Sequence, residues 1–188
     1  MQFIRTEIPD LVIIEPKVFG DTRGYFFESY RRELFEKEIG KVDFIQDNES
    51  KSSYGILRGL HIQKPPFTQA KLVRVITGEV LDVVVDVRTD SPTFGKHLAI
   101  KLSEDNKRQL FIPRGFAHGF IVLSKEAIFS YKVDNYYNLE SESGIIYNDS
   151  TLNIDWILER NNIELSPKDN ILPKFNSSFF FTKNEYSN

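Results

Sequence analysis

The chain of 188 residues contains no cysteine, which excludes disulfide bonds, thiolate metal sites and a cysteine nucleophile. It has only three histidines, so a metal site built from several imidazoles has few possible ligands. With 24 Lys and Arg against 27 Asp and Glu, the formal net charge is −3, and no overall positive field favours nucleic acid. An anionic ligand therefore requires a local cluster of basic side chains.

Long hydrophobic runs are also missing. The most apolar stretch, 80–87, is interrupted by Asp82 and Asp86, and no stretch has the length and hydrophobicity of a membrane span. The first ten residues lack the basic region and apolar segment of a signal peptide. From these observations we expect a cytoplasmic protein, which agrees with the lack of cysteine.

Aromatic residues are abundant, with 16 Phe and 8 Tyr, and most lie in short extended runs, which favours β-structure. Strands are predicted at 11–14, 25–30, 44–46, 56–62, 72–76, 80–87, 95–102, 109–112, 116–123 and 128–133. A helix is predicted over 31–39, where Leu34, Phe35 and Ile39 share one face and Gly40 ends it. Regularly spaced strands without long helices between them predict an all-β antiparallel sandwich or barrel.

The length fits one domain with a sizeable core, and we find no internal repeat or linker. We therefore expect a single domain over 1–188, with about 174–188 as a C-terminal tail. The strand pattern loosens after Leu139, and 140–144 is expected to be a loop. Trp156 is a candidate packing anchor, and Phe179–Phe181 is predicted to be a strand or a docked tail.

The stretch Ile56–Lys71 holds an arginine, a histidine and two lysines between apolar residues. His61 lies between Leu60 and Ile62, so its ring should project from the opposite face of the strand. Such an inward titratable group is either a hydrogen-bonded core histidine or part of a site. In the strand predicted at 80–87, the carboxylates Asp82 and Asp86 share one face with Val80 and Val84, while Leu81, Val83, Val85 and Val87 share the other. Burying an unpaired carboxylate costs several kcal/mol, so it needs partners in a cavity or a solvated face.

Six short motifs in the same order resemble the dTDP-4-dehydrorhamnose 3,5-epimerase family, and the match covers nearly the whole chain from Phe3 to about Pro173. They are Phe19–Gly24 (FGDTRG), Gln46–Asn48 (QDN), Leu57–His61 (LRGLH), Ser91–Lys96 (SPTFGK), Pro113–Phe120 (PRGFAHGF), and Asn148-Asp149 with Asp155-Trp156. The resemblance implies a cupin-type jelly-roll barrel with a few short helices. It also implies a homodimer that exchanges N-terminal strands, and neither a metal nor an organic cofactor, with no nucleic acid or membrane as partner.

The implied reaction is epimerisation at C3 and C5 of dTDP-4-dehydro-6-deoxy-D-glucose to give dTDP-4-dehydro-L-rhamnose, for dTDP-L-rhamnose and cell-surface polysaccharide biosynthesis. Both C–H bonds are α to the C4 ketone, so removal of either proton gives an enolate without a redox step. This isomerase chemistry needs a base with a pKa near 7, a proton donor on the opposite face of the sugar and a cation at the developing oxyanion.

The resemblance assigns these roles to particular residues. His61 matches the base, and Asp169 matches the carboxylate that orients it and raises its basicity. Lys71 matches the cation near the C4 oxygen, and Tyr131 matches the acid that returns a proton from the other side.

A further set of polar side chains matches residues that bind the nucleotide and its diphosphate. These are Arg23, Glu28, Gln46, Asp47, Asn48, Arg58, His118, Glu142 and Lys168. Arginine suits this task because its planar fork binds phosphate oxygens in pairs. Tyr137 resembles the aromatic residue that stacks on the base, and Arg23 and Glu28 are expected to come from the partner subunit.

Each of these side chains also has a structural interpretation. Tyr131 can be a hydrogen-bonded core tyrosine, Asp169 a helix N-cap or turn residue, and His118 a brace for a turn. Solvated surface charge is the corresponding interpretation for Lys71, Arg23 and Arg58. Agreement of the whole set with one family favours the functional interpretation. Arg58 and His61 lie on opposite faces of a regular strand, so either Gly59 introduces a bulge or Arg58 reaches the ligand from the strand's end.

Three rival functions remain. A metal-dependent cupin is disfavoured, because Gln63 stands where a second ligand is expected and His97 lies in a different strand. A second rival is an enzyme of the same scaffold that acts at one centre only or isomerises the ketone; the nucleotide is also open, because Tyr137 and the Gln46–Asn48 contacts do not specify thymine. A non-catalytic sugar-nucleotide-binding protein is the third rival, which the joint presence of the base, its carboxylate, the cation and the acid argues against.

Overall fold

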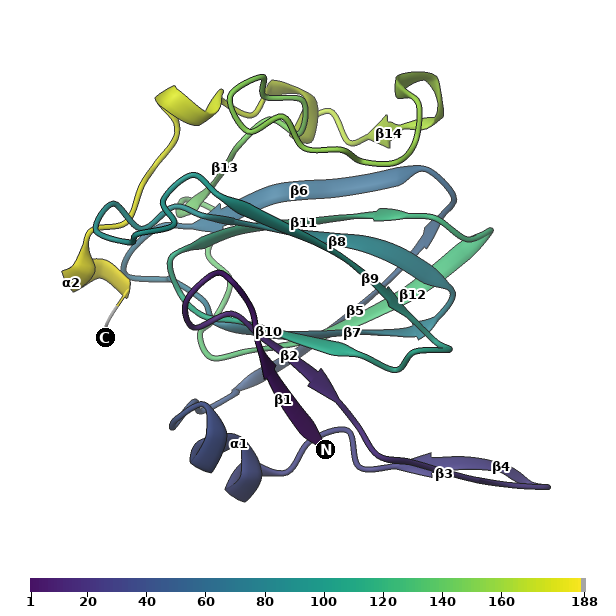
Figure 1. Ribbon diagram of the computed structural model, residues 1–188. Coiled ribbons are helices and arrows are strands. Elements are labelled where there is room, and N and C mark those ends of the chain that lie inside the picture. The colour runs from purple at the N-terminus through teal and green to yellow at the C-terminus, as the bar shows by residue number, and fades with distance from the viewer. Residues whose placement is uncertain (187–188) are drawn as a thin grey trace.

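The computed structural model describes residues 1–186, in which two antiparallel sheets face each other (Figure 1). The first sheet has the order β1 (Gln2–Arg5), β2 (Val12–Glu15), β10 (Gln109–Ile112), β7 (Lys71–Thr77), β12 (Glu126–Val133) and β5 (Gln46–Ser53). The second has the order β13 (Glu142–Gly144), β6 (Ile56–Gln63), β11 (Phe116–Val122), β8 (Glu79–Asp86) and β9 (His97–Ser103), with β14 (Glu164–Leu165) parallel to β6. The predicted all-β class is confirmed.

The few helices are short. They are α1 (Arg32–Glu38), the 3₁₀ turns η1 (Arg160–Asn162), η2 (Asp169–Ile171) and η3 (Phe175–Ser177), and α2 (Lys183–Tyr186). The predicted helix 31–39 is confirmed as α1, whose Phe35 is buried against Phe111. No helix in the described chain has the length and apolar character of a membrane span.

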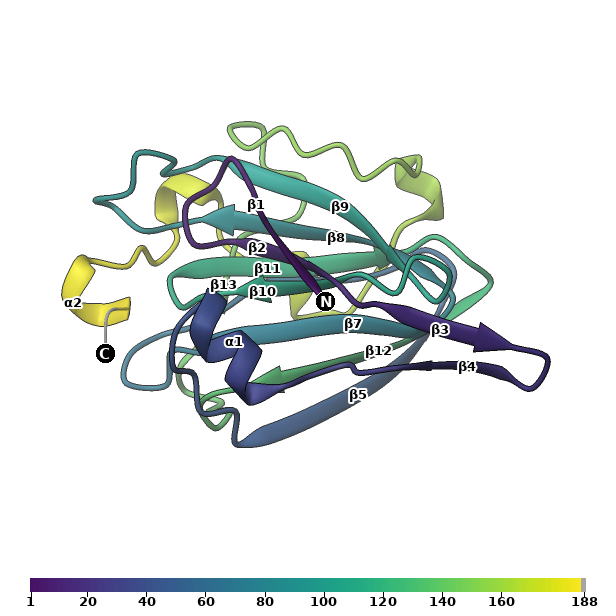
Figure 2. The same cartoon turned by 60° about the horizontal axis from the view of Figure 1, so that its bottom comes forward.

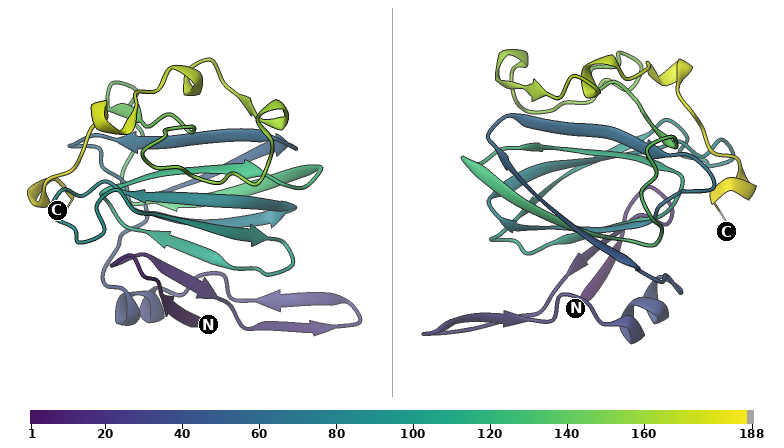
Figure 3. Two further views of the ribbon diagram at one scale, coloured as in Figure 1. Left: turned by 45° about the horizontal axis from the view of Figure 1, so that its top comes forward. Right: turned by 180° about the vertical axis from the view of Figure 1, so that it is seen from behind.

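The valine-rich strand β8, which lies between β11 and β9 in the second sheet, packs against a separate hydrophobic core on each face. Along β8, Val80 and Val84 point between the sheets, while Val83 and Val85 point to the outer face, and all four are buried. The chain beyond β13 covers that outer face (Figure 3), which is why both faces of β8 are apolar. The sheets therefore enclose one core, and the C-terminal segment closes another.

Trp156 anchors this C-terminal cover, as predicted. Its ring is buried, and its Nε1 donates a hydrogen bond to the carbonyl oxygen of Tyr147 at 2.8 Å. Phe181 is also buried and forms an isolated bridge with Arg88, so 179–181 is a docked tail rather than a strand of the sheets.

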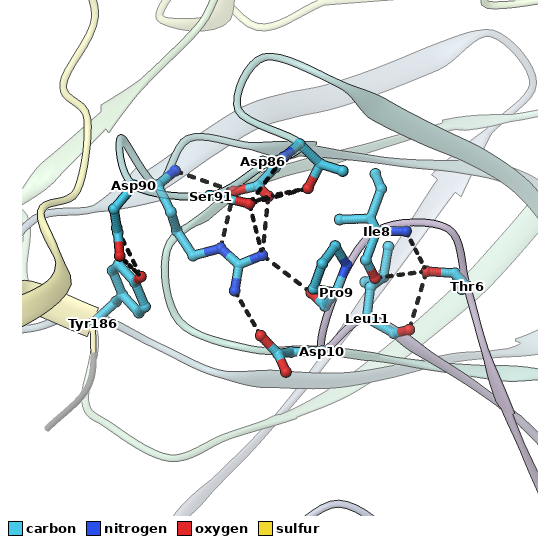
Figure 4. A network of polar contacts seen from close by, with 11 residues as sticks. Thr6, Ile8, Pro9, Asp10, Leu11, Asp86, Asp90, Ser91 and Tyr186 are labelled. Atoms are coloured by element: carbon cyan, nitrogen blue, oxygen red, sulfur yellow. Dashed lines mark hydrogen bonds and ion pairs between the residues drawn. The ribbon is translucent and has the colours of Figure 1, made fainter.

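Arg88 joins the N-terminal loop and the C-terminal helix to β8, and its partners Asp86, Pro9 and Asp10 are labelled in Figure 4. Its guanidinium donates to both carboxylate oxygens of Asp86 at 2.9 Å, to Asp10 at 2.8 Å and to the carbonyl of Pro9. It also lies over the rings of Phe116 and of Tyr186 in α2. These contacts fasten the N-terminal loop and the C-terminal helix to one end of the second sheet.

Asp86 therefore has the partners that an inward carboxylate requires. Ser91 and Thr93 donate their hydroxyls to it at 2.6 and 2.7 Å. Burial would raise the pKa of Asp86, but the hydrogen bonds from Arg88, Ser91 and Thr93 lower it below its usual value. The Ser-Pro-Thr motif of the sequence thus has a structural role here.

Three segments differ from the predictions. The polar stretch 47–53 is itself a strand, because it lies at the sheet edge and pairs with β12 along its whole length. The expected loop 140–144 contains β13, which pairs with β6. The predicted strand 25–30 ends at Phe27, since it belongs to the hairpin of β3 (Val18–Asp21) and β4 (Gly24–Phe27).

That hairpin projects from the rest of the molecule, away from both sheets (Figures 1 and 2). Its apolar side chains meet solvent, with Phe19 54%, Tyr25 60% and Phe26 69% exposed. Aromatic side chains exposed together in this way mark an interaction surface.

Candidate active site

A bulge in β6 places Arg58 and His61 on the same face. His61 is paired with His118 and Arg58 with Phe120, so three steps along β6 oppose two along β11. Gly59 has φ +126°, and a Cβ there would lie 2.5 Å from the Cα of Gly119. Only glycine suits this conformation and this close approach. The bulge hypothesis is confirmed, and both side chains point between the sheets.

A cavity of about 370 Å³ lies between the sheets at this point. Ten of the side chains singled out in the sequence line it: Gln46, Asn48, Arg58, His61, Lys71, His118, Tyr131, Tyr137, Glu142 and Lys168. His61, Arg58 and His118 come from the second sheet, whereas Lys71 and Tyr131 come from the first. The imidazole and the phenol therefore occupy opposite walls.

His61 and Asp169 form the predicted dyad. The His61 Nε2 lies 2.6 Å from Asp169 Oδ1, although the two residues are 108 positions apart in the chain. The His61 side chain is 28% exposed and that of Asp169 only 3%. Burial would raise the pKa of Asp169, but the hydrogen bond and the charge of His61 lower it below its usual value. The carboxylate therefore fixes the hydrogen on Nε2 and leaves Nδ1 as the basic nitrogen.

Lys71 supplies a cation whose charge is easily lost. Burial lowers the pKa of its ammonium from 10.5 to about 8, while the carboxylate of Asp82 acts in the opposite direction. At neutral pH most of the ammonium groups stay charged, without a hydrogen bond to another side chain among residues 1–186. An unpartnered cation in a cavity can bind a developing oxyanion.

Tyr131 is suited to donate a proton. Burial raises the pKa of its phenol above 10, although the positive charges of Arg58 and Lys168 oppose that effect. The hydroxyl is therefore protonated at neutral pH. Its ring packs beside Phe129, two residues earlier on β12, at 6.1 Å between ring centroids.

The mouth of the cavity carries a chain of polar contacts. Glu142 accepts hydrogen bonds from Lys168 Nζ at 2.6 Å and from the Tyr137 hydroxyl at 3.1 Å. Glu142 raises the pKa of Lys168, which stays charged beside the exposed Tyr137 ring. Lys168, Arg58 and Lys71 together form the local basic cluster that an anionic ligand needs.

Four of the sequence-predicted residues do not line the cavity. Asp169 lies behind His61, and Asp47 lies on the other face of β5, where it pairs with Lys132 at 2.9 Å. Arg23 and Glu28 belong to the projecting hairpin and the chain just after it. Arg23 pairs with Asp21, and Glu28 pairs with Arg31.

Sequence reasoning missed several cavity residues, which are Ser50, Gln63, Gln69, Phe120 and Phe129. Two-residue alternation gives the signal for four of them, because each lies two positions from a residue already singled out. Gln69 is also two positions from Lys71, but it lies in the loop before β7, where strand alternation does not apply. Residues 1–186 contain no group of three His, Asp or Glu side chains placed to hold a metal ion.

A family model described as dTDP-4-dehydrorhamnose 3,5-epimerase matches residues 5–177. The chain belongs to this family. It is 54% identical over 182 residues to the dTDP-4-dehydrorhamnose 3,5-epimerase of Shigella flexneri, covering 96% of this chain and 99% of that protein.

Solved structures of the dTDP-4-dehydrorhamnose 3,5-epimerase family have the same fold. The enzyme of Elizabethkingia anophelis superposes with a TM-score of 0.91 at 52% identity, covering 95% of this chain and 99% of that one. The dTDP-6-deoxy-D-glucose-3,5-epimerase of Legionella pneumophila, in complex with dTDP-4-keto-L-rhamnose, gives 0.90 at 50% identity, covering 94% and 93%. The cupin-type jelly roll predicted from the sequence is confirmed.

Proposed function

We propose that this protein epimerises C3 and C5 of dTDP-4-dehydro-6-deoxy-D-glucose, giving dTDP-4-dehydro-L-rhamnose in dTDP-L-rhamnose biosynthesis. One observation carries this proposal: the imidazole of His61 and the phenol of Tyr131 lie on opposite walls of one cavity that Lys71 also lines. An inversion needs a base on one side of the carbon and a donor on the other. The family relationship and the ligand of the Legionella pneumophila structure support this choice of substrate.

The steps follow from the charge states of the side chains. Nδ1 of His61 removes the proton from the carbon next to the ketone, and the electron pair moves to the C4 oxygen. The ammonium of Lys71 stabilises that enolate, a contribution that commonly amounts to roughly 3–4 kcal/mol for one such group. Tyr131 then protonates the carbon from the opposite side. Solvent returns a proton to Tyr131 and accepts one from His61, so the protein is unchanged after each inversion.

Substrate binding uses the basic cluster at the cavity mouth. Arg58 and Lys168 provide the positive charge for the diphosphate, and their placement beside Tyr137 lets the base stack on that exposed ring. Gln46 and Asn48, which are hydrogen-bonded to each other at 2.8 Å, supply amide groups along the same wall.

We further propose that the protein is a homodimer in which the hairpin of β3 and β4 packs on a second copy. The exposed Phe19, Tyr25 and Phe26 support this arrangement, because a lone hairpin with aromatic residues in solvent is poorly stabilised. Arg23 and Glu28, which lie outside the cavity of their own chain, then complete the cavity of the partner.

Incubation with dTDP-4-dehydro-6-deoxy-D-glucose in D₂O, followed by NMR, tests the proposed function. Deuterium at both C3 and C5 with formation of the L-rhamno product is expected. Deuterium at one centre only would identify a single-site epimerase, and none at all with a folded protein would identify a binding protein. In the control variant His61→Ala we expect no exchange and a dTDP affinity within about threefold of the wild type, since the base contributes to the chemistry rather than to nucleotide binding. The cytoplasmic location stays a prediction for cell fractionation.

A further inference from the structure

Asp82 is a buried carboxylate that the proposed reaction does not use. It lies on β8, whose register with β11 places Phe120 opposite Asp82 and His118 opposite Val84. Asp82 and His118 are therefore diagonal neighbours on the inner face of the second sheet. The His118 Nε2 lies 2.9 Å from Asp82 Oδ2, and the Asp82 side chain is completely buried.

Only half of this carboxylate is hydrogen-bonded. Oδ1 of Asp82 is buried and has no hydrogen-bond partner among residues 1–186. A buried charge with so few partners costs stability, commonly several kcal/mol. Asp86, four residues further along β8 and on the same face, shows the contrast, because Arg88, Ser91 and Thr93 surround it. The incomplete pairing of Asp82 therefore requires a reason other than stability.

The ammonium of Lys71 is an unpaired positive charge on which the carboxylate of Asp82 acts. Lys71 makes no hydrogen bond or ion pair within the described chain, and the carboxylate of Asp82 is the group whose charge favours its ammonium form. The other titratable side chains that line the cavity are Arg58, His61, His118, Tyr131, Tyr137, Glu142 and Lys168. The carboxylate among them, Glu142, is paired with Lys168 at 2.6 Å, so Asp82 is the counter-charge for Lys71.

We propose that Asp82 is a positioning residue for the epimerisation: from behind the cavity wall it keeps Lys71 charged and fixes the ring of His118. This inference rests on the proposed function. Lys71 and His118 line the cavity whereas Asp82 does not, so Asp82 acts through them and not on the substrate.

His118 then presents an acceptor to the ligand. Burial lowers its pKa below 6.5, with Lys71 and His61 acting in the same direction and Asp82 against them, so the ring is neutral at pH 7. Because Nε2 donates its hydrogen to Asp82, Nδ1 carries a lone pair. A neutral acceptor suits a sugar hydroxyl better than a phosphate, which places His118 beside the sugar rather than the diphosphate.

The variant Asp82→Asn tests this inference, because it keeps the shape and the acceptor for His118 but removes the charge. ¹⁵N-lysine NMR, with Lys71→Met to assign the signal, should show the pKa of Lys71 falling by about one unit or more. The kcat/KM of the variant relative to wild type should then fall with pH, from near equality at pH 6 to about a tenfold deficit above pH 9. A merely structural role would lower activity equally at every pH.

Asp86→Asn is the matched control, since it neutralises a buried carboxylate on the same strand and face. It should lower the melting temperature and leave the pH dependence of kcat/KM unchanged. An unchanged pKa of Lys71 in Asp82→Asn would overturn the inference, and so would parallel pH profiles. The lysine titration needs no substrate, so it separates this inference from a failure of the proposed function.

A second measurement uses the wild-type protein and covers the case in which Asp82→Asn does not fold. ¹⁵N NMR of the imidazoles should show His118 as a neutral ring with its hydrogen on Nε2 at pH 7. A charged ring, or a hydrogen on Nδ1, would contradict the arrangement around Asp82.

Discussion

The pKa values of Lys71, Asp169 and Tyr131 are all shifted from those of free side chains. Burial lowers the pKa of Lys71 against the opposing charge of Asp82 and raises the pKa of Tyr131, whereas the pKa of Asp169 is lowered, against the effect of burial, by its hydrogen bond to His61. At pH 7 the set therefore contains an ammonium, a carboxylate and a neutral phenol. This combination can stabilise an enolate, orient a base and return a proton without any further adjustment.

The cation gives the first prediction, for Lys71→Met. Unfolded chains keep the lysine protonated up to about pH 10.5, whereas the folded protein loses that proton near pH 8. Between these values the unfolded state binds more protons, so wild-type stability rises with pH. Removing the charge should stabilise the protein at pH 7 by roughly 1–3 kcal/mol while lowering kcat about 100-fold or more.

Urea unfolding at pH 7 and pH 9.5 checks this expectation, with the change in stability between the two pH values compared in wild type and variant. Wild-type activity should also decline as the pH rises through about 8. A variant that is less stable at pH 7 and keeps near-normal kcat would contradict both expectations. The buried charge of Lys71 would then not destabilise the folded protein, and Lys71 would not stabilise the enolate.

How far the sequence predicts these residues depends on the range of the contact. Alternation along single strands correctly orients His61 and Tyr131, because that pattern is local. The contact between His118 and Asp82 depends on the register between β8 and β11, which no local pattern contains. The partner of His61 is 108 positions away, so only the family resemblance pointed to Asp169.

Among the elements, β6 contributes most to the site through its bulge. The hydrophobic pattern alone predicts a regular strand over 56–62, which would place Arg58 and His61 on opposite faces. The two facing glycines, Gly59 and Gly119, allow the backbones of β6 and β11 to approach and the extra residue to fit. The sequence raised the bulge as one of two possibilities, and strand pairing decides between them.

Gly59→Ala tests this element, with Gly40→Ala as its matched control. Both glycines have nearly the same φ, +126° and +125°, but a Cβ at Gly40 meets nothing within 4 Å. Each variant should lose about 1–2 kcal/mol from backbone strain, and Gly59→Ala should lose roughly 1–3 kcal/mol more from contact with Gly119 and His118. Chemical denaturation measures the difference.

Activity should follow the same contrast, because moving β6 separates Arg58 from His61. Gly59→Ala should have a strongly reduced kcat, whereas Gly40→Ala, in the turn after α1, should match the wild type. Equal losses of stability in the two variants would mean that the close approach of β6 and β11 is not needed.

Polar edge strands were the hardest elements to predict. Asp47, Glu49 and Lys51 in β5 are typical of a loop, yet the backbone pairing with β12 makes this stretch a strand. Its inner face carries Gln46 and Asn48 to the cavity, so its polar composition serves binding rather than core formation. Strand propensity predicts buried strands better than polar edge strands, because the apolar side chains of a buried strand favour both the extended backbone and burial.

At the scale of the whole molecule, most of the chain builds a closed structure and one hairpin does not. Contacts around Arg88 hold the Pro9–Asp10 loop and helix α2 against the second sheet, while β3 and β4 extend outward (Figure 2) with their aromatic side chains exposed. The sequence pattern shows neither the contacts around Arg88 nor the projection of the hairpin, because each depends on how a segment is placed relative to distant parts of the chain. The single-domain expectation over 1–188 stays a prediction.

The hairpin gives a prediction about assembly. Phe26→Asp should convert the homodimer to a monomer, because it places a charge in the apolar surface proposed to pack on the partner. Light scattering coupled to size-exclusion chromatography measures this. Ile157→Asp, at another exposed apolar position, should leave the mass unchanged.

The monomer should also bind dTDP more weakly, since Arg23 of the partner is then lost from the cavity. Arg23→Ala alone should weaken binding without changing the mass. A wild-type protein that is monomeric at micromolar concentration, with full activity, would rule out the shared site.

The central claim is that base and acid act from opposite walls, and Tyr131→Phe in D₂O tests it most directly. NMR of the substrate after incubation should show deuterium entering at C3 and C5 through His61, while formation of the inverted product falls by about 100-fold or more because the donor is gone. Loss of deuterium entry and of inversion to the same extent would contradict the account, since the phenol would then be needed for proton removal itself.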